Sequence, residues 1–241
     1  MDQVIAASAL TDTIAGYRLV AQDRPLPGGK PIEYRFTITG PDGKPVTDFA
    51  VAQTKRMHFY AIRADLTGVQ HAFPTMADDG TWTVPLAPLG PGVWHLIAFF
   101  TPGSGPGEGK EFALSSPVTV PGAPTGALLP AAARTTQVDG YTVSVDGTLM
   151  RGMAHPLTVT IRKGAKPVTD LEPYLGASAH LAAFHEGDLA FAPFRPVTAV
   201  SVGSLGQQFR AAPPTPGNWR LFVQFRTGGK LHTAALTLQV Y

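Results

Sequence analysis

The chain has 241 residues, of which 26 are Gly and 23 are Pro, and its charged fraction of 15% is low for a globular domain. The hydrophobic fraction of 44% is enough for a substantial core and excludes a disordered, highly charged polymer. So many Gly and Pro residues exclude a fold of long helices, because Pro breaks helices and Gly weakens them. The net charge of +2 comes from scattered basic residues, which excludes the basic stripe of a nucleic-acid-binding protein.

Cysteine is absent, which excludes disulfides, thiolate catalysis, iron–sulfur clusters and Cys-ligated zinc. No apolar run is long enough to predict a transmembrane segment. The first residues, Met-Asp-Gln, lack the positive charge that begins a signal peptide. We therefore expect either a cytoplasmic protein or the mature part of an exported one, with no signal peptide in this chain.

The sequence contains an internal repeat. Residues 44–48 (Lys-Pro-Val-Thr-Asp) recur as residues 166–170, and the same offset of 122 relates His58 to His180. Collinear matches flank this run: Gly-Tyr at 16–17 and 140–141, and Pro-Gly-x-Trp at 91–94 and 216–219. The pattern predicts two copies of one module, spanning residues 14–122 and 138–241, joined by an Ala- and Pro-rich linker at 123–137.

Each module has the pattern of short strands separated by turns. In chain order we expect strands at residues 34–39, 57–63, 81–84 and 93–100, and then at 157–161, 181–184, 221–225 and 231–240. Regular spacing with Gly and Pro turns predicts an all-β fold of two tandem antiparallel β-sandwich modules of the immunoglobulin-like type. Trp94 and Trp219 each precede a long apolar run and are expected to anchor the cores.

Sequence motifs of enzymes are missing, so we predict that the protein is not an enzyme and assign no catalytic residue. The chain has no GxSxG, P-loop, dinucleotide-binding GxGxxG or HExxH motif. The glycine-rich stretch at 103–109 is interpreted as a hairpin loop, and Asp78-Asp79 as part of a turn rather than a calcium site.

Histidine is the residue type most able to carry chemistry here. A hairpin turning at Ala64-Asp65 would place His58 opposite His71, close enough for the two imidazoles to share a metal ion. The corresponding hairpin in the second module, turning at Glu186-Gly187, would place His180 opposite Pro193. A structural role for His58 and His180 as buried, neutral side chains is the alternative interpretation.

The chain resembles secreted two-repeat actinobacterial proteins of the hypothetical or heavy-metal-binding-like type. The resemblance covers nearly all of both modules and depends most on Met-His-Phe at 57–59, residues 63–71, Pro-Thr-Met at 74–76 and Asp-Gly-Thr-Trp at 79–82. In the second module it depends on residues 171–177, His180-Leu181 and residues 187–190. The resemblance implies export, a pair of β-sandwiches and a His-rich site for copper or zinc.

The chain departs from this family where the metal would bind. The relatives carry His-x-His-Pro in each module, whereas this chain has His71-Ala72-Phe73-Pro74 and Pro193-Phe194-Arg195-Pro196. In the hairpin interpretation, positions 58, 71 and 73 form one three-ligand face, and positions 180, 193 and 195 form the other. An apolar ring and a cation therefore replace ligands, which predicts a degraded site.

Two hypotheses for function follow. The first is a non-enzymatic, extracytoplasmic binding protein with a degraded His site, which acts on a protein or cell-envelope partner. The second is a periplasmic or extracellular copper- or zinc-binding protein, or metal-delivery protein, that uses His58 and His71, joined by His180 if the two modules pool their imidazoles. No tightly held cofactor is expected in the first case, and copper or zinc would be bound weakly.

Overall fold

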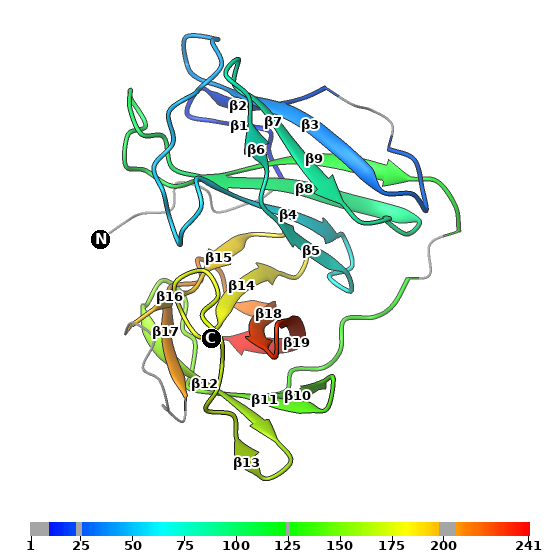
Figure 1. Cartoon of the computed structure of the whole chain (residues 1–241), viewed down its shortest axis with the longest axis vertical. Coiled ribbons are helices and arrows are strands. Elements are labelled where there is room, and N and C mark those ends of the chain that lie inside the picture. Colours follow the sequence, from blue (N-terminus) through cyan, green and yellow to red (C-terminus); the bar gives the residue numbers. More distant parts are fainter. Residues whose placement is uncertain (1–9, 23–25, 124–125, 198–205) are drawn as a thin grey trace. The chain divides into compact units, whose positions relative to one another are not determined.

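The computed structural model describes residues 10–22, 26–123, 126–197 and 206–241, which divide into two compact units meeting at Leu128 and Leu129. The described residues contain strands and turns but no helix (Figure 1). They accordingly include no helix long and apolar enough to span a membrane. The strand β10 (Thr135–Val138) begins within the range that the sequence assigns to the linker.

The first unit is a sandwich of two antiparallel sheets. One sheet has the order β1 (Thr13–Ile14), β2 (Tyr17–Ala21), β3 (Ile32–Thr39), β7 (Thr81–Leu86), β6 (Thr75–Met76). The other has the order β5 (Val69–Ala72), β4 (Met57–Arg63), β8 (Gly92–Phe100), β9 (Phe112–Val120). Alternation along the strands sends every second side chain into one shared core, as in β3, where Tyr34, Phe36 and Ile38 are fully buried.

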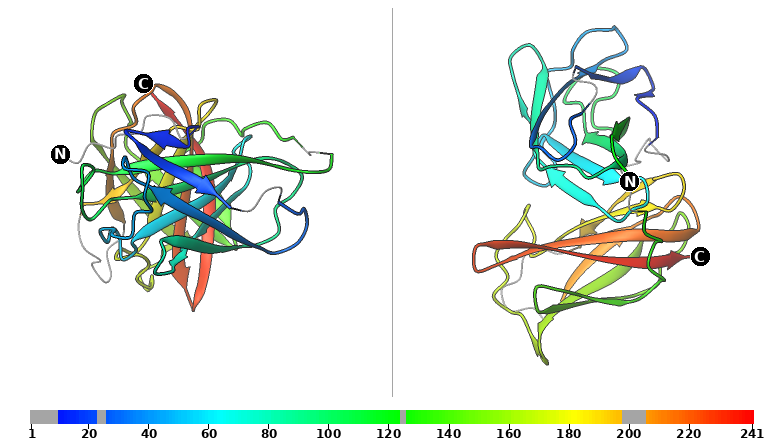
Figure 2. Two further views of the ribbon diagram at one scale, coloured as in Figure 1. Left: turned by 90° about the horizontal axis from the view of Figure 1, so that it is seen from above. Right: turned by 90° about the vertical axis from the view of Figure 1, so that its right-hand side faces the viewer.

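The second unit repeats this arrangement. Its first sheet has the order β10, β11 (Tyr141–Asp146), β12 (His155–Lys163), β17 (Gln207–Ala211), β16 (Arg195–Pro196), with β13 (Lys166–Pro167) also paired to β12. Its second sheet has the order β15 (Phe191–Pro193), β14 (His180–His185), β18 (Gly217–Thr227), β19 (Lys230–Val240). The hairpin of β18 and β19 is the longest in the chain, and its twist is clear in Figure 2.

The topology is that of an immunoglobulin-like sandwich. In the first unit β3 pairs with β7 in one sheet and β4 pairs with β8 in the other, and in the second unit β12 pairs with β17 and β14 with β18. The chain therefore crosses between the sheets three times in each unit. The prediction of an all-β chain with two tandem antiparallel β-sandwich modules is confirmed.

The two tryptophans occupy matching places in their units. The side chains of Trp94 and Trp219 are 6% and 0% exposed, and each indole Nε1–H donates to the carbonyl four residues earlier, Gly90 at 2.9 Å and Thr215 at 3.1 Å. Trp94 lies opposite Arg63 on β4, and Trp219 lies opposite His185 on β14. Positions 63 and 185 differ by the same 122 residues that separate His58 from His180.

A candidate metal site on the β4–β5 hairpin

His58 and His71 reach the same face of the β4–β5 hairpin in a register that differs from the expected one. The structure pairs Ile62 with Val69 and Tyr60 with His71, so the expected pairing of His58 with His71 is wrong by two residues. A shift of two residues leaves every side chain on its original face, because side chains alternate with a period of two. His58 and His71 are therefore diagonal neighbours rather than direct partners.

The shift comes from the loop between the strands, which is longer than the expected turn at Ala64-Asp65. The Arg63 N–H donates to the Gly68 carbonyl, and the loop between them carries Leu66 with a left-handed φ of 61°. The Leu66 side chain is only 1% exposed, so the loop folds back to bury it. Burial of this leucine compensates for the strained backbone that a non-Gly residue has at positive φ.

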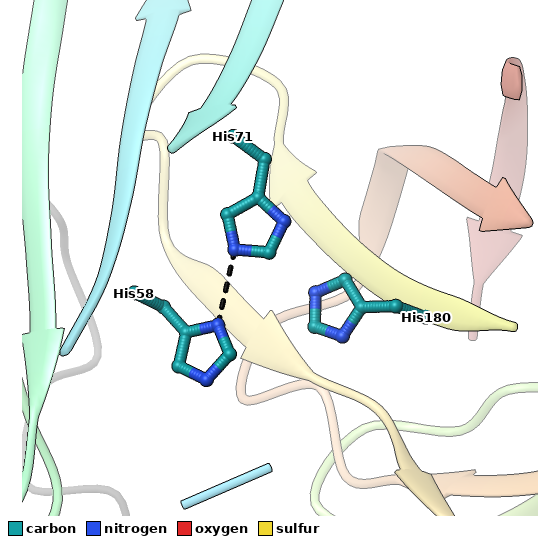
Figure 3. Close-up of side chains that lie close together, drawn as sticks. All are labelled: His58, His71 and His180. Carbon is teal, nitrogen blue, oxygen red and sulfur yellow. Dashed lines mark hydrogen bonds between the residues drawn. The ribbon is translucent and has the colours of Figure 1, made fainter. Parts of the chain in front are cut away.

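The two imidazoles are joined directly. His58 Nδ1 lies 3.0 Å from His71 Nε2, and His58 Nε2 lies 3.0 Å from the Ala52 carbonyl oxygen (Figure 3). A carbonyl oxygen only accepts, so His58 Nε2 carries the proton and His58 Nδ1 accepts from His71 Nε2–H. The backbone thus fixes the tautomer of His58 and aims its lone pair at His71, as second-shell carbonyls do for metal-bound imidazoles.

Aromatic rings surround the pair. The ring of His71 stacks on Tyr60, with centroids 4.3 Å apart and planes 10° apart. The Phe73 ring is steeply inclined to both imidazoles, and its centroid lies 4.7 Å from that of His71 and 5.8 Å from that of His58. The Lys55 ammonium lies 4.9 Å from the centroid of the Phe73 ring. Phe73 therefore stands beside both imidazoles, and the Lys55 cation lies close to the same ring.

The surroundings of His58 keep its imidazole neutral. Burial lowers the pKa of His58 below its ordinary value, the hydrogen bond to Ala52 opposes this, and the charge of Lys55 lowers the pKa further. Metal ions bind neutral imidazole, so this shift preserves the ligand form to lower pH than for an exposed histidine.

The separation of the two nitrogens also fits a shared metal ion. Zinc–nitrogen bonds of about 2.0–2.1 Å with a tetrahedral angle require nitrogens about 3.3 Å apart. The observed 3.0 Å is within a small side-chain rotation of that value. Metal binding would replace the hydrogen bond between the rings, with His71 presenting an unprotonated Nε2. Two imidazoles supply half of a four-coordinate shell.

The second unit does not reproduce this face. His180 lies on β14, opposite Gln224 of β18, and its ring approaches Tyr174 edge-on at 6.5 Å between centroids. Pro193 lies opposite Ala182 rather than His180, which is the same two-residue shift as in the first unit. Arg195 begins β16 and pairs with Arg210 in the other sheet. The expectation that positions 180, 193 and 195 share one strand-pair face is therefore wrong, because the chain changes sheets after Pro193.

The sequence gives no histidine partner at a useful spacing to His95, His155, His185 or His232, which predicts surface or packing roles for them. His185 and His232 instead have carboxylate partners, with Nδ1 2.6 Å from Asp188 and 2.7 Å from Asp139, respectively. The strand register places His232 and Asp139 where the first unit has Phe112 and Ala15, so the sequence alone gives no sign that these two residues form a pair.

A family model described as a domain of unknown function (DUF8832) matches residues 136–241, which is the second unit from β10 onward. No curated protein matches the chain in sequence.

Solved structures of several proteins resemble the chain at low sequence identity. A Salmonella alpha-2-macroglobulin is 12% identical over 100% of this chain with a TM-score of 0.32, and this chain spans 16% of it. Fibronectin(III)-like modules of Clostridium thermocellum CbhA are 10% identical over 92% of this chain and 93% of theirs, with a TM-score of 0.25. Invasin, a bacterial integrin-binding protein, is 12% identical over 93% of this chain with a TM-score of 0.27, and this chain spans 38% of it.

Proposed function

We propose that the protein is a non-enzymatic binding protein whose first unit holds a weak site for zinc or copper at His58 and His71. The observation that supports this most directly is the 3.0 Å approach of His58 Nδ1 to His71 Nε2, with the tautomer of His58 fixed by Ala52. A purely structural imidazole–imidazole hydrogen bond is the competing explanation, and metal titration separates the two.

Weak affinity is part of the proposal. Phe73 stands beside both imidazoles where the related proteins would carry a further histidine, and Lys55 adds a positive charge near the site. A ring without a donor atom contributes no ligand, and a nearby cation opposes the metal electrostatically.

The test is calorimetric titration of the metal-free chain with Zn(II) and Cu(II). We expect weak binding by the wild type, none by His58→Ala, and a gain of about tenfold or more in affinity for Phe73→His, because a third imidazole joins an arranged pair. Phe73→Leu is the matched control, since it removes the ring without adding a donor. Binding by Phe73→His should weaken as pH falls below about 6.5, where free imidazole is protonated.

Two results would overturn the proposal. Tight, stoichiometric binding by the wild type that His58→Ala abolishes would mean that the site is intact rather than weakened, and would favour the metal-delivery hypothesis. No binding by the wild type and no gain in Phe73→His would leave only the structural hydrogen bond. His180→Ala, titrated in parallel, checks whether the ligand set extends to the second unit, because loss of affinity there would add His180 to it.

An extracytoplasmic location, which the family resemblance implies, and a protein or cell-envelope partner complete the proposal. Fractionation of cells that produce the native protein, with detection by antibody, is the corresponding measurement. We expect recovery outside the cytoplasm, and recovery in the cytoplasm alone would contradict this part of the proposal.

A further inference from the structure

A chain of four polar side chains runs through one end of the second unit, far in sequence from the candidate metal site. Asp139 Oδ2 lies 2.7 Å from His232 Nδ1, His232 Nε2 lies 3.0 Å from Thr227 Oγ1, and Thr227 Oγ1 lies 2.9 Å from the Tyr141 hydroxyl. His232 is 4% exposed and Thr227 is 9% exposed, so the centre of the chain is buried.

When His232 is neutral, the donors and acceptors of these four side chains allow only one direction for the series of hydrogen bonds. Asp139 is an acceptor, so His232 Nδ1 carries the proton and Nε2 accepts from the Thr227 hydroxyl. Thr227 Oγ1 then accepts from the Tyr141 hydroxyl. Hydrogen bonds from His232 and Lys230 hold the pKa of Asp139 below its ordinary value, which keeps it an acceptor.

The first unit supplies an internal comparison, because its equivalent positions are apolar. Phe112 lies opposite Phe100 where His232 lies opposite Phe225, and Ala15 has a φ of 50° where Asp139 has 49°. The remaining position, Thr227, corresponds to Pro102. At three positions that are distant in sequence, the second unit thus has a polar residue where the first unit has an apolar one. Together these polar residues form one connected series of hydrogen bonds.

The polar chain ends at an open pocket of about 480 Å³. Its lining includes Tyr141, Thr227, Lys163, Lys166 and Asp170, so the ionisable side chains give one net positive charge. Neither lysine makes an ion pair with a carboxylate among the described residues, although Lys163 Nζ lies 5.4 Å from the centroid of the Tyr141 ring.

The equivalent pocket of the first unit has the opposite character. Its volume is about 510 Å³, and its ionisable lining residues are Asp42, Lys44 and Asp48, with one net negative charge. The hydroxyl of Tyr17, the counterpart of Tyr141, already accepts a hydrogen bond from the Gly107 N–H at 3.0 Å. The repeated run Lys-Pro-Val-Thr-Asp lines both pockets, so the charge difference comes from the residues around it.

We propose that the pocket of the second unit binds a small oxyanion, a carboxylate or a tetrahedral phosphate-like group, between Lys163, Lys166 and the Thr227 hydroxyl. The lysines supply positive charge, and Thr227 supplies a directional donor at the buried end when His232 is protonated. The pocket of the first unit lacks this combination and does not bind such an ion.

Protonation of His232 controls the donor. Neutral His232 accepts a hydrogen bond from the Thr227 hydroxyl at Nε2, so that hydroxyl proton is not available to an ion in the pocket. Protonated His232 donates from Nε2, Thr227 then accepts from both His232 and Tyr141, and its own proton turns toward the bound ion. The charged groups around His232 are Asp139, Lys230 and Lys163, whose ammonium lies near the Tyr141 ring that contacts His232. Oxyanion affinity should therefore be higher when His232 Nε2 carries a proton, a state that acidic pH favours.

The experiment is NMR titration of the full chain with sodium sulfate, with sodium chloride at equal ionic strength as the control. Sulfate keeps its charge between pH 5.5 and 8.5, so a change in affinity reports the protein alone. We expect amide shifts at residues 166–170 and 227–229, none at residues 42–48, and affinity about three- to tenfold higher at pH 5.5, as one added hydrogen bond would give. Sodium acetate at pH 8.5 distinguishes planar from tetrahedral ligands by which binds more tightly.

Matched variants separate the contribution of the lysine charge to sulfate affinity from that of the Thr227 hydroxyl. Thr227→Val should weaken sulfate binding and remove its pH dependence, whereas Thr227→Ser should keep the affinity and the pH dependence of the wild type. Lys163→Gln should weaken sulfate binding at both pH values. Asp139→Ala/His232→Phe installs the residues of the first unit, which guards against loss of folding, and should also remove the pH dependence. Shifts in both pockets, absence of sulfate binding, or an unchanged affinity in folded Thr227→Val would overturn the proposal.

Discussion

Trp94 and Trp219 show how a single residue type fixes both sandwiches. Each ring fills the core of its unit, and each Nε1–H is satisfied by a carbonyl four residues earlier, so the polar atom is buried at no cost. We expect Trp219→Ala to lower the free energy of unfolding of the second unit by about 3–5 kcal/mol, the usual range for deleting a large core aromatic. Urea denaturation followed by circular dichroism measures this, and a loss well below about 3 kcal/mol would contradict the anchoring role.

The buried position of His95 predicts how the free energy of unfolding depends on pH. Burial lowers the pKa of His95 on β8, so the unfolded chain binds its proton more readily than the folded chain does. The stability that depends on neutral His95 is complete above about pH 6.5 and is lost as pH falls through the lower, folded-state pKa. In the presence of chelator, the difference in unfolding free energy between pH 8 and pH 5 should be smaller for His95→Gln than for wild type. An equal or larger difference in the variant would contradict this assignment.

At the scale of single elements, the β4–β5 hairpin shows what sequence patterns can and cannot predict. Alternation of apolar residues predicts the strands, their shared face and the proximity of His58 and His71. It does not predict the register, because a two-residue shift leaves the alternation unchanged. The register is set by the loop, where Leu66 is buried at positive φ, and no turn motif in the sequence indicates this.

The same loop makes Gly68 a sensitive position. A Cβ atom added at Gly68 would lie 2.9 Å from Trp94 Cη2, and the buried indole has no room to move away. Gly68→Ala should therefore lower the free energy of unfolding by about 1–3 kcal/mol through overpacking. Gly90→Ala is the control, since a Cβ there meets nothing within 4 Å. Equal melting temperatures for the two variants would contradict the packing argument.

On the scale of the whole molecule, each unit encloses its own core. The second core draws on both sheets, from Val143 and Leu157 to Trp219 and Leu236, and all of these residues follow Leu129. A fragment of residues 129–241 should therefore fold alone, with β-type circular dichroism and blue-shifted emission from Trp219, its single tryptophan. Loss of that emission in favour of a solvent-exposed spectrum would show that the core needs the rest of the chain.

The repeat was evident from the sequence, but its functional divergence was not. Matching runs such as Lys-Pro-Val-Thr-Asp reveal common ancestry, whereas the polar chain of Asp139, His232 and Thr227 depends on three separate replacements. Their convergence becomes visible only when the strands bring them together, because β11, β18 and β19 set their spacing in space. Likewise, the transfer of Arg195 to the other sheet depends on where β15 ends, which the Pro-rich sequence leaves undetermined.

The polar chain of the second unit also has a consequence for assembly. Tandem domains of one topology can exchange equivalent strands while folding, which produces misassembled chains. If β9 took the place of β19, Phe112 would leave Asp139 and Thr227 without their imidazole partner. If β19 took the place of β9, His232 would be buried against Ala15 and Pro102, neither of which offers a side-chain partner. Each exchange leaves polar groups unsatisfied at a cost of about 1–3 kcal/mol per group, so the divergence of these residues favours correct pairing of each final strand with its own domain.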